Sequence, residues 1–319
     1  MTLPYKTATV FGGTGFIGRY VVRELARLGY RVKVATRMPE SAYFVRLYGT
    51  VGQIVPFQTN LRDAASIDAA VSGSEVVVNC VGILYQNRRS KFHRLHAEVP
   101  SMIAASCAKF GVARFVHLSA MGVDKALSQS GKTKLEGEKK VFEHFPAATI
   151  LRPSAVFGPE DRFFNLFASL AQKLPVLPLV GGGRMKFQPV YVGDVAAAVI
   201  ASVVRTDTSG GIYELGGPEV MSLRDVYNYV FKATGRTRAL MPLPFALAKV
   251  EAFFLQMVPG CPLLTTDQVE SLKTDNVASP YALGLADLGV GTTGMELIVP
   301  GYLERFRSGG RFAETRAAA

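Results

Sequence analysis

Short apolar runs rich in β-branched residues alternate with longer segments of helical periodicity over the first 150 residues. Apolar runs without internal alternation indicate strands that are buried on both faces. Strands are expected at residues 7–11, 31–36, 53–57, 74–79, 114–119 and 148–152, and helices at 20–28, 64–71 and 99–110. Strands that alternate with helices require parallel crossovers. The pattern therefore predicts an α/β fold, a doubly wound parallel sheet.

The pattern changes after Pro153, where prolines become frequent and three consecutive glycines occupy residues 181–183. Such residues mark loops and a departure from the sheet. We expect a sheet domain at residues 1–160, with a return segment at about 186–205. Residues 161–185 and 206–319 are expected to form a smaller C-terminal lobe over the carboxyl ends of the strands, where folds of this class bind ligands.

A segment from Leu243 to Val258, flanked by prolines, is apolar around most of its helical circumference. It is either a buried helix of the smaller lobe or a helix that contacts a membrane or a partner. It contains Lys249 and Glu251, and no stretch of about 18 residues in the chain lacks charge. We therefore expect neither a transmembrane span nor, from the opening residues, a secretory signal.

The motif Gly12-x-x-Gly15-x-x-Gly18 lies between the first strand and the first helix. Gly12 permits a tight turn, Gly15 lets the backbone approach a pyrophosphate, and Gly18 lets the helix pack closely on the sheet. The N-terminus of the helix offers unpaired N–H groups to a phosphate. The motif predicts dinucleotide binding, although a glycine turn that serves only packing would have the same sequence.

The end of the second strand bears on which dinucleotide binds. Sites that prefer NAD place an acidic residue there to hold the ribose 2′-hydroxyl, whereas this chain has Arg37 and no acid before Glu40. Arg19, directly after the third glycine, can reach the same place. Both arginines favour the 2′-phosphate of NADP(H), and the alternative is that they are solvated surface residues.

Composition and charge restrict the partners. The 319 residues carry 36 Lys+Arg and 25 Asp+Glu, a net charge of +11. The excess lies in the first 235 residues, with 28 basic and 17 acidic side chains, and forms no dense stripe. We therefore expect no nucleic-acid partner. The diffuse charge suits solvent, an anionic membrane surface or an acidic protein. The three cysteines and four histidines lack metal-ligand spacing, so no metal is expected and a reducing compartment is indicated.

Three further motifs follow predicted strands: Asn79-Cys-Val-Gly82, Leu151-Arg-Pro-Ser-Ala-Val-Phe-Gly-Pro159 and Val190-Tyr-Val-Gly-Asp194. With the glycine motif, they make residues 7–230 resemble the short-chain dehydrogenase/reductase superfamily, in its extended and atypical branches. The resemblance implies a Rossmann fold. It also implies cofactor contacts from Gly12, Gly15, Phe16, Ile17, Gly18, Arg19, Arg37, Asn60, Leu61, Cys80, Val81, Gly82, Ser119, Lys134 and Pro153. Tyr191 and Asp194 are expected to have a structural role, and His117 to be a packed core residue.

Active members of this superfamily use a Tyr-x-x-x-Lys pair with a serine on the preceding strand. Lys134 matches the lysine and Ser119 the serine, but Ser130 stands in place of the tyrosine, and no tyrosine occurs between Tyr85 and Tyr191. A serine hydroxyl is too weak an acid to replace an activated phenol. The chain is therefore expected to bind the nucleotide without conventional reductase activity. An active NADP-dependent reductase or epimerase that uses another acid or water remains an alternative.

The segments His96–Pro100, Arg152–Phe163 and Leu264–Glu270, with Asp275-Asn276, are similar to the nucleotide-binding accessory subunits of respiratory complex I (NADH:ubiquinone oxidoreductase), in a bacterial form. The resemblance implies a structural NADPH and complex I subunits as partners. It also implies a cytoplasmic, peripheral position at the inner face of the cytoplasmic membrane. A nucleotide-sensing regulator is a further alternative.

Overall fold

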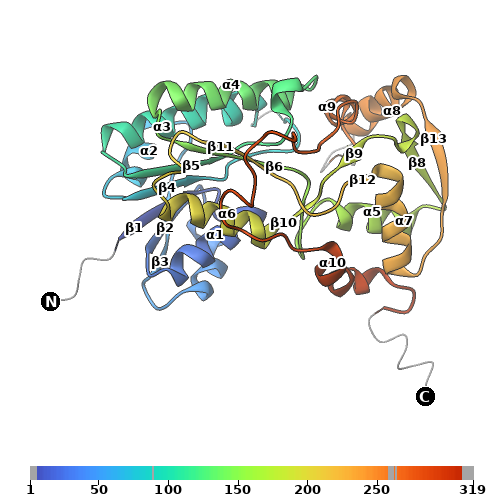
Figure 1. The fold of residues 1–319 in the computed structure, drawn as a ribbon, viewed down its shortest axis with the longest axis horizontal. Helices are drawn as coiled ribbons and strands as arrows, with labels where there is room; N and C mark the ends of the chain where they lie inside the picture. Colours follow the sequence, from blue (N-terminus) through green and yellow to red (C-terminus); the bar gives the residue numbers. More distant parts are fainter. Residues whose placement is uncertain (1–5, 88–89, 258–261, 263, 311–319) are drawn as a thin grey trace, which may run out of the picture.

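A computed structural model describes residues 6–87, 90–257, 262 and 264–310. Its main element is a parallel sheet of seven strands in the order β11-β6-β5-β4-β1-β2-β3 (Figure 1). The strands are β1 (Thr7–Phe11), β2 (Arg31–Thr36), β3 (Ile54–Gln58), β4 (Val76–Asn79), β5 (Arg114–Leu118), β6 (Thr149–Pro153) and β11 (Ile212–Leu215). The six expected strands are confirmed to within two residues at each end. Their order reverses between β1 and β4, which is the place where doubly wound sheets bind dinucleotides.

Helices cover both faces of this sheet. One face carries α1 (Phe16–Arg27) and α6 (Val192–Val204), and the other carries α2 (Ala64–Val71), α3 (Val99–Lys109) and α4 (Gln129–His144) (Figure 1). Successive strand residues point to opposite faces, so that Val10 and Val78 join the core under α1 whereas Phe11 and Val77 join the core under α3. Both cores exclude water, which explains the apolar runs without alternation in the sequence. The doubly wound α/β fold is thus confirmed.

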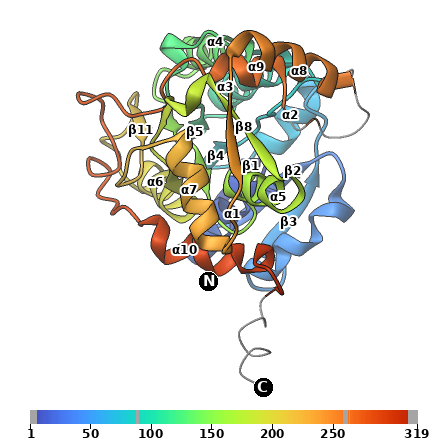
Figure 2. The ribbon, with the colours of Figure 1, turned by 90° about the vertical axis from the view of Figure 1, so that its right-hand side faces the viewer.

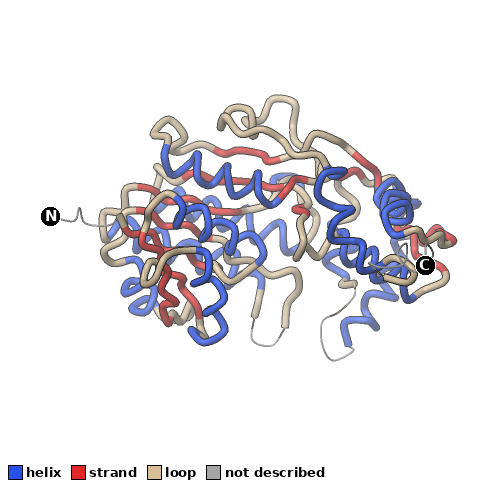
Figure 3. The backbone as a smooth tube through the Cα atoms, turned by 90° about the horizontal axis from the view of Figure 1, so that it is seen from below, coloured by secondary structure: helices blue, strands red, loops and turns tan. Residues whose placement is uncertain are grey.

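The rest of the chain forms a smaller lobe, seen end-on in Figure 2. Its helices are α5 (Phe164–Lys173), α7 (Leu223–Thr234), α8 (Phe245–Met257), α9 (Thr266–Ser271) and α10 (Met295–Leu303). Its parallel pair β8 (Val176–Val180) and β13 (Ala239–Leu243) packs with them, as does the antiparallel pair β9 (Lys186–Phe187) and β12 (Met221–Ser222). A further pair, β7 (Val156–Phe157) and β10 (Val190–Tyr191), leads from the sheet into this lobe. Seen from below, the long strands lie together at the N-terminal side and the lobe's strands lie among helices (Figure 3).

Part of the segment expected in the smaller lobe lies instead against the large sheet. β11 pairs in parallel with β6 and forms the edge of the seven-stranded sheet. Leu285 and Leu288 pack in the core between the sheet and the helices α1 and α6. The expected start of the lobe at residue 206 is wrong for these residues, because Tyr213 and Leu215 find their apolar partners on the sheet. The remainder of the domain division stays a prediction.

Helix α8 packs in an unusual way. Its small residues Ala248 and Ala252 are buried, whereas Leu247, Val250, Phe253 and Phe254 are more than half exposed. The expectation of a buried helix is therefore wrong for these large side chains, and the alternative of an outward apolar face fits the structure. Residues 258–261, which include Cys261, lie outside the described residues. None of the helices in the described part of the chain is both long and apolar enough to cross a bilayer.

Candidate nucleotide-binding site

The glycine turn joins β1 to α1 and approaches the end of β4. Gly12 has a positive φ of 74°, and a Cβ atom there would come within 2.9 Å of the Cys80 carbonyl group. A Cβ atom on Gly18 would collide with the Gly12 carbonyl oxygen. Any larger residue at either position would push α1 or β4 away from the turn. The structural roles expected for Gly12 and Gly18 are confirmed by this geometry.

The N-terminus of α1 is open to an anion. Gly15 is its N-cap residue and is exposed, and Phe16 and Ile17 begin the helix. Within the described part of the chain, no side chain caps this helix and its first turn carries no acidic residue. The first amide groups of the helix therefore point toward solvent with the positive end of the helix dipole behind them. This arrangement suits a pyrophosphate.

Arg19 is held over the glycine turn by several contacts. Its Nε donates to the Gly15 carbonyl at 3.2 Å and its Nη2 to the Thr14 carbonyl at 3.4 Å. Its guanidinium carbon lies 5.1 Å from the centroid of the Phe44 ring, and Nη1 lies 3.5 Å from a carboxylate oxygen of Glu160. Glu160 also accepts a hydrogen bond of 2.9 Å from the Tyr20 hydroxyl. The sequence does not predict either contact. Glu160 lies 141 positions away from Arg19, and Phe44 lies in the irregular segment after β2.

The other expected contacts lie at the carboxyl ends of neighbouring strands. Arg37 is exposed directly after β2, and Asn60 is exposed after β3, where its side chain accepts from the Arg62 amide. Leu61 is half-buried against the core under α3. Cys80, Val81 and Gly82 follow β4, beside the glycine turn, and Pro153 ends β6. The structure thus brings Gly12 and Cys80 into contact, whereas Arg37 and Asn60 lie exposed at the edge of the candidate site.

Lys134 and Ser119 form the inner end of the site. The Lys134 ammonium donates to the Ser119 carbonyl at 3.1 Å. Burial lowers the pKa of Lys134 to about 8, against the opposing effect of the Glu138 charge. Among the described residues, the buried Ser119 hydroxyl has no hydrogen-bond partner. A buried hydroxyl without a partner is costly, so a hydroxyl-bearing ligand fits here, and a nicotinamide ribose offers this chemistry.

Two buried histidines beside this lysine are neutral. The Asn79 amide donates to Nδ1 of His117 at 3.1 Å, and the Ile83 amide donates to Nε2 of His96 at 3.2 Å. Burial, and then the Lys134 charge, lower the pKa of each histidine to about 3. Each therefore accepts one hydrogen bond at neutral pH and serves neither as a cation nor as an acid. The expectation that His117 is a packed core residue is confirmed.

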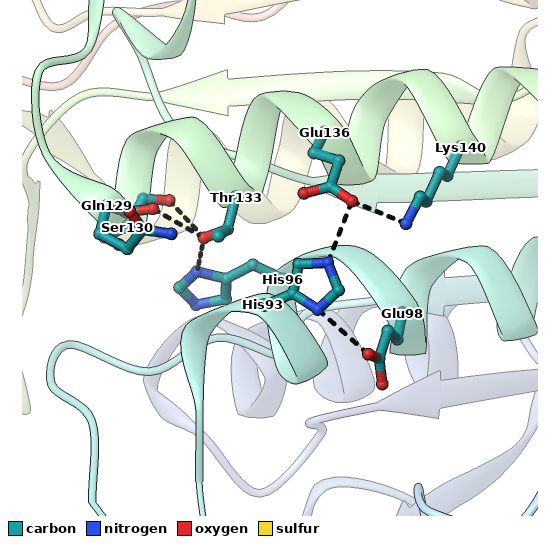
Figure 4. Close-up of polar contacts among 8 residues, drawn as sticks. All are labelled: His93, His96, Glu98, Gln129, Ser130, Thr133, Glu136 and Lys140. Carbon is teal, nitrogen blue, oxygen red and sulfur yellow. Dashed lines mark hydrogen bonds and ion pairs between the residues drawn. The ribbon is translucent and has the colours of Figure 1, made fainter.

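Helix α4 is fixed against the segment η2 (Arg94–Glu98), as Figure 4 shows. The Thr133 hydroxyl lies 3.3 Å from His96 Nδ1 and donates to the Gln129 carbonyl of its own helix at 2.9 Å. On the outer surface, His93 lies 3.0 Å from Glu98 and 3.1 Å from Glu136 (Figure 4). These contacts hold the α4 backbone, and therefore Lys134, in one position along the site.

Ser130, the expected replacement of the tyrosine, lies where the sheet domain contacts the smaller lobe. The Asp267 carboxylate of α9 accepts hydrogen bonds from the Gln129 amide at 2.6 Å and from the Ser130 amide at 3.2 Å. The Ser128 side chain accepts from the Gly131 amide. The first three amides of α4 are therefore satisfied, two of them by a residue from the other lobe. Asp267 was not among the expected site residues, because 137 positions separate it from Ser130.

The Arg-Pro motif after β6 has a structural role. Arg152 makes two hydrogen bonds to the buried Glu138 carboxylate, at 3.0 and 2.7 Å, and lies 3.7 Å from Glu214 on β11. Glu214 in turn accepts from the Ser279 amide. This cluster ties α4 and β11 to the C-terminal segment. It was missed in the sequence, where charged residues so far apart give no sign of meeting in the core.

The Tyr-Val-Gly-Asp motif also holds the two parts of the chain together. Asp194 accepts hydrogen bonds from the Thr293 amide at 2.7 Å and from the Thr293 hydroxyl at 2.8 Å. The structural role expected for Asp194 is thus confirmed. No group of three or more His, Cys, Asp or Glu side chains within the described ranges is arranged to hold a metal ion.

A pocket of about 570 Å³ lies between the N-terminus of α4, helices α8 and α9, and the segment before α3. Its wall is mostly polar, with Gln86, Gln129, Gln256 and Asp267 beside the aromatic Tyr85. The pocket is therefore next to Ser130, at the side of the site where the two lobes meet.

Comparisons with known proteins agree with this geometry. A model of the NAD dependent epimerase/dehydratase family matches residues 8–216. The chain belongs to this family. A solved structure with a similar fold is that of an NADPH-dependent quinone oxidoreductase from Escherichia coli in complex with NADPH. The TM-score is 0.74 at 20% identity, with coverage of 93% of this chain and 99% of the other. At that identity the likeness supports the fold alone.

Two curated relatives share a higher sequence identity with this chain than the solved structure does. The chain is 38% identical over 304 residues to the mitochondrial NADH dehydrogenase (ubiquinone) 1 alpha subcomplex subunit 9 of Mus musculus, across 94% of this chain and 80% of the relative. It is 35% identical over 315 residues to the subunit of the same name from Arabidopsis thaliana, across 95% and 78%. The resemblance to accessory subunits of this respiratory enzyme is therefore confirmed.

Proposed function

We propose that this protein is a non-catalytic accessory subunit of a respiratory NADH:ubiquinone oxidoreductase that holds NADP(H) as a structural group. The observation that carries the proposal is the contrast within one site. The glycine turn, the open N-terminus of α1 and the Lys134–Ser119 pair suit a dinucleotide, whereas Ser130 stands where an acid/base tyrosine is needed. The type of complex is inferred from the relatives, which match this chain over nearly its whole length.

The preference for NADP(H) over NAD(H) rests on charge. Arg37 is exposed at the end of β2, next to the edge where an adenosine ribose lies in this fold. Arg19 is held at the glycine turn within reach of a phosphate. An arginine gives a 2′-phosphate two parallel hydrogen bonds and a full charge. When bound, the nucleotide would supply hydride chemistry, but this chain's residues near it only bind and orient.

One experiment separates the three readings of the site. The complex is isolated from native membranes, its bound nucleotide is identified, and quinone or other carbonyl substrates are added while the nicotinamide fluorescence is followed. The proposal expects bound NADPH that is not oxidised in steady state, together with copurifying oxidoreductase subunits. Steady oxidation would identify an active reductase. Nucleotide exchange that changes the bound partner would identify a regulator, and either result contradicts the proposal.

We further propose that the protein lies at the inner face of the cytoplasmic membrane, with the outward face of α8 (Leu247, Val250, Phe253 and Phe254) toward the lipid surface. An exposed apolar helix face is typical of interfacial binding. The double substitution Phe253→Ser and Phe254→Ser is expected to release the protein from membranes. Leu297→Ser, at a leucine of α10 that is even more exposed, serves as the control. Equal partitioning of both variants would refute the membrane contact.

A further inference from the structure

We infer that residues 38–51 form a second docking surface, directed at an acidic protein partner and separate from the α8 face. This inference rests on the proposed function, which supplies a multi-subunit complex. The segment follows β2 and consists mainly of the 3-10 helix η1 (Pro39–Tyr48). Its exposed apolar side chains, here called the 38–51 surface, are Met38, Tyr43, Phe44, Leu47 and Val51. Five such residues in one short segment exceed the isolated exposed residues usual on a soluble protein.

The segment is held firmly, so its exposed residues are not those of a loose loop. Ala42 and Val45 are fully buried beneath it. At its end, the Gln53 side-chain amide donates to the Ala26 carbonyl at 2.6 Å and to the Tyr30 carbonyl at 3.1 Å. A surface that is already ordered loses little conformational entropy when it is covered. The 38–51 surface is thus prepared for a partner.

The charge around this surface identifies the partner's chemistry. Three arginines, Arg19, Arg37 and Arg46, lie in or next to this segment, and Glu40 is the one acidic residue in residues 37–53. The Arg46 guanidinium lies 5.5 Å from the centroid of the Tyr43 ring, and Arg19 lies over Phe44. An apolar centre within a basic rim is complementary to an acidic surface with an apolar centre.

The residue types favour a protein over a lipid surface. Tyrosine, phenylalanine, methionine and arginine are the types enriched at the centres of protein interfaces, whereas lysine is depleted there. Residues 37–51 contain all four types and no lysine. The 38–51 surface also lies beyond β2 and β3, at the opposite end of the long axis from α8 (Figure 1). A flat membrane that contacts α8 therefore leaves this surface free for a neighbouring subunit.

The same surface adjoins the nucleotide site through one residue. Arg19 contacts Phe44 on one side and the Gly15 and Thr14 carbonyls of the glycine turn on the other. A phosphate that holds Arg19 therefore also fixes the Phe44 ring. This contact gives a structural nucleotide a direct effect on the surface that a partner meets.

The test uses the whole complex. Variants Leu47→Glu and Arg46→Glu replace the wild-type chain in cells, and the complex is isolated on native gels. Leu297→Glu is the matched control, because Leu297 is 78% exposed and Leu47 is 85% exposed. We expect the two test variants to be retained in the complex about tenfold less than the control, the effect of losing one strong interface contact. Retained NADPH in the purified variants shows that they fold.

The outcomes separate the two proposals. Wild-type chain absent from the complex overturns the proposed function and this inference with it. Wild-type chain present, with Leu47→Glu and Arg46→Glu retained like Leu297→Glu, overturns only the 38–51 surface. Purified chain is also mixed with vesicles that contain phosphatidylglycerol. Vesicle binding that both test variants abolish would assign the surface to anionic lipid and overturn the protein partner.

Discussion

The Asp267 carboxylate accepts a hydrogen bond of 3.2 Å from the Ser130 amide, although 137 positions separate the two residues in the sequence. The same carboxylate binds the Gln129 amide, so the smaller lobe caps a helix of the sheet domain. A helix that begins at a residue capped by another lobe is stabilised only when both lobes are in place. The two lobes are therefore joined at the site itself.

The substitution Asp267→Ala tests this junction. It leaves two amides of α4 without their acceptor, and losing a helix cap lowers the free energy of unfolding by about 1–2 kcal/mol. Urea unfolding followed by circular dichroism measures the change. Asp207→Ala is the control, because Asp207 is exposed and its salt bridge is with nearby Arg205, and it should have little effect. Equal stability of both variants would show that the Asp267 cap adds nothing.

The substitution Lys134→Met has a pH-dependent effect on the nucleotide-free protein. Burial lowers the pKa of Lys134 from 10.5 to about 8, so between these values the unfolded chain binds more protons than the folded chain. The wild type therefore gains stability as the pH rises from 8 to 10.5, by at most about 1.4 kcal/mol per pH unit. The variant lacks this gain.

Urea unfolding at pH 7 and at pH 10 measures both proteins. We expect Lys134→Met to be more stable than the wild type at pH 7, by on the order of 1–3 kcal/mol, and the difference to shrink at pH 10. A difference that stays constant with pH would mean that the Lys134 ammonium is solvated.

Replacing Arg37 tests the cofactor preference. Arg37→Ser is expected to weaken NADPH binding about tenfold, the effect of one charge-assisted hydrogen-bonding group, and to leave NADH binding unchanged. Titration calorimetry with both nucleotides measures this. Arg31→Ser is the matched control, since Arg31 is exposed at the opposite end of the same strand. If NADH binding falls as much as NADPH binding, Arg37 does not contact the 2′-phosphate.

The ring of Phe44 is expected to position Arg19 for the nucleotide. Phe44→Ala removes a cation–π contact that stabilises by about 0.5–1 kcal/mol, so NADPH affinity should fall about two- to fivefold. Tyr43→Ala removes the neighbouring contact with Arg46, which lies away from the glycine turn, and should leave the affinity unchanged. The same loss in both variants would point to a general disturbance of η1.

The buried pair of Arg152 and Glu138 is expected to matter more than any surface pair. Glu138→Gln removes the bidentate carboxylate and leaves Glu214 at 3.7 Å as a weaker partner of Arg152, so the loss of unfolding free energy should approach but not exceed the about 3–5 kcal/mol of an uncompensated buried charge. Glu75→Gln breaks the exposed pair with Lys6 and should change stability little. Thermal unfolding compares the two. Similar melting temperatures would mean that water reaches Arg152.

The sequence predicts the sheet well because its strands are buried on both faces. A run of valines such as residues 76–78 is apolar on both faces of its strand, so it is stable only between two helical layers. β11 was not predicted, because Ile212–Leu215 is short and comes after the chain has left the sheet. Its partner β6 lies about 60 residues earlier, and only the tertiary fold brings the two strands together.

The residues of the candidate site likewise fall into those that the sequence predicts and those that only the fold reveals. The glycine turn and Lys134 are visible in the sequence because local spacing determines their geometry. Asp267, Glu160 and the Arg152 cluster come from pairs that are more than 100 residues apart or are buried ion pairs, and no local pattern announces them. Helix α8 was ambiguous for a related reason, since an apolar circumference does not say which side faces the core.

The outward face of α8 also bears on the life of the protein before assembly. Chaperones and proteases act on chains that expose apolar side chains, and Phe253 and Phe254 are exposed in the isolated chain. In the proposed complex a covered α8 face would protect the chain, so that copies made in excess of their partners would be degraded first.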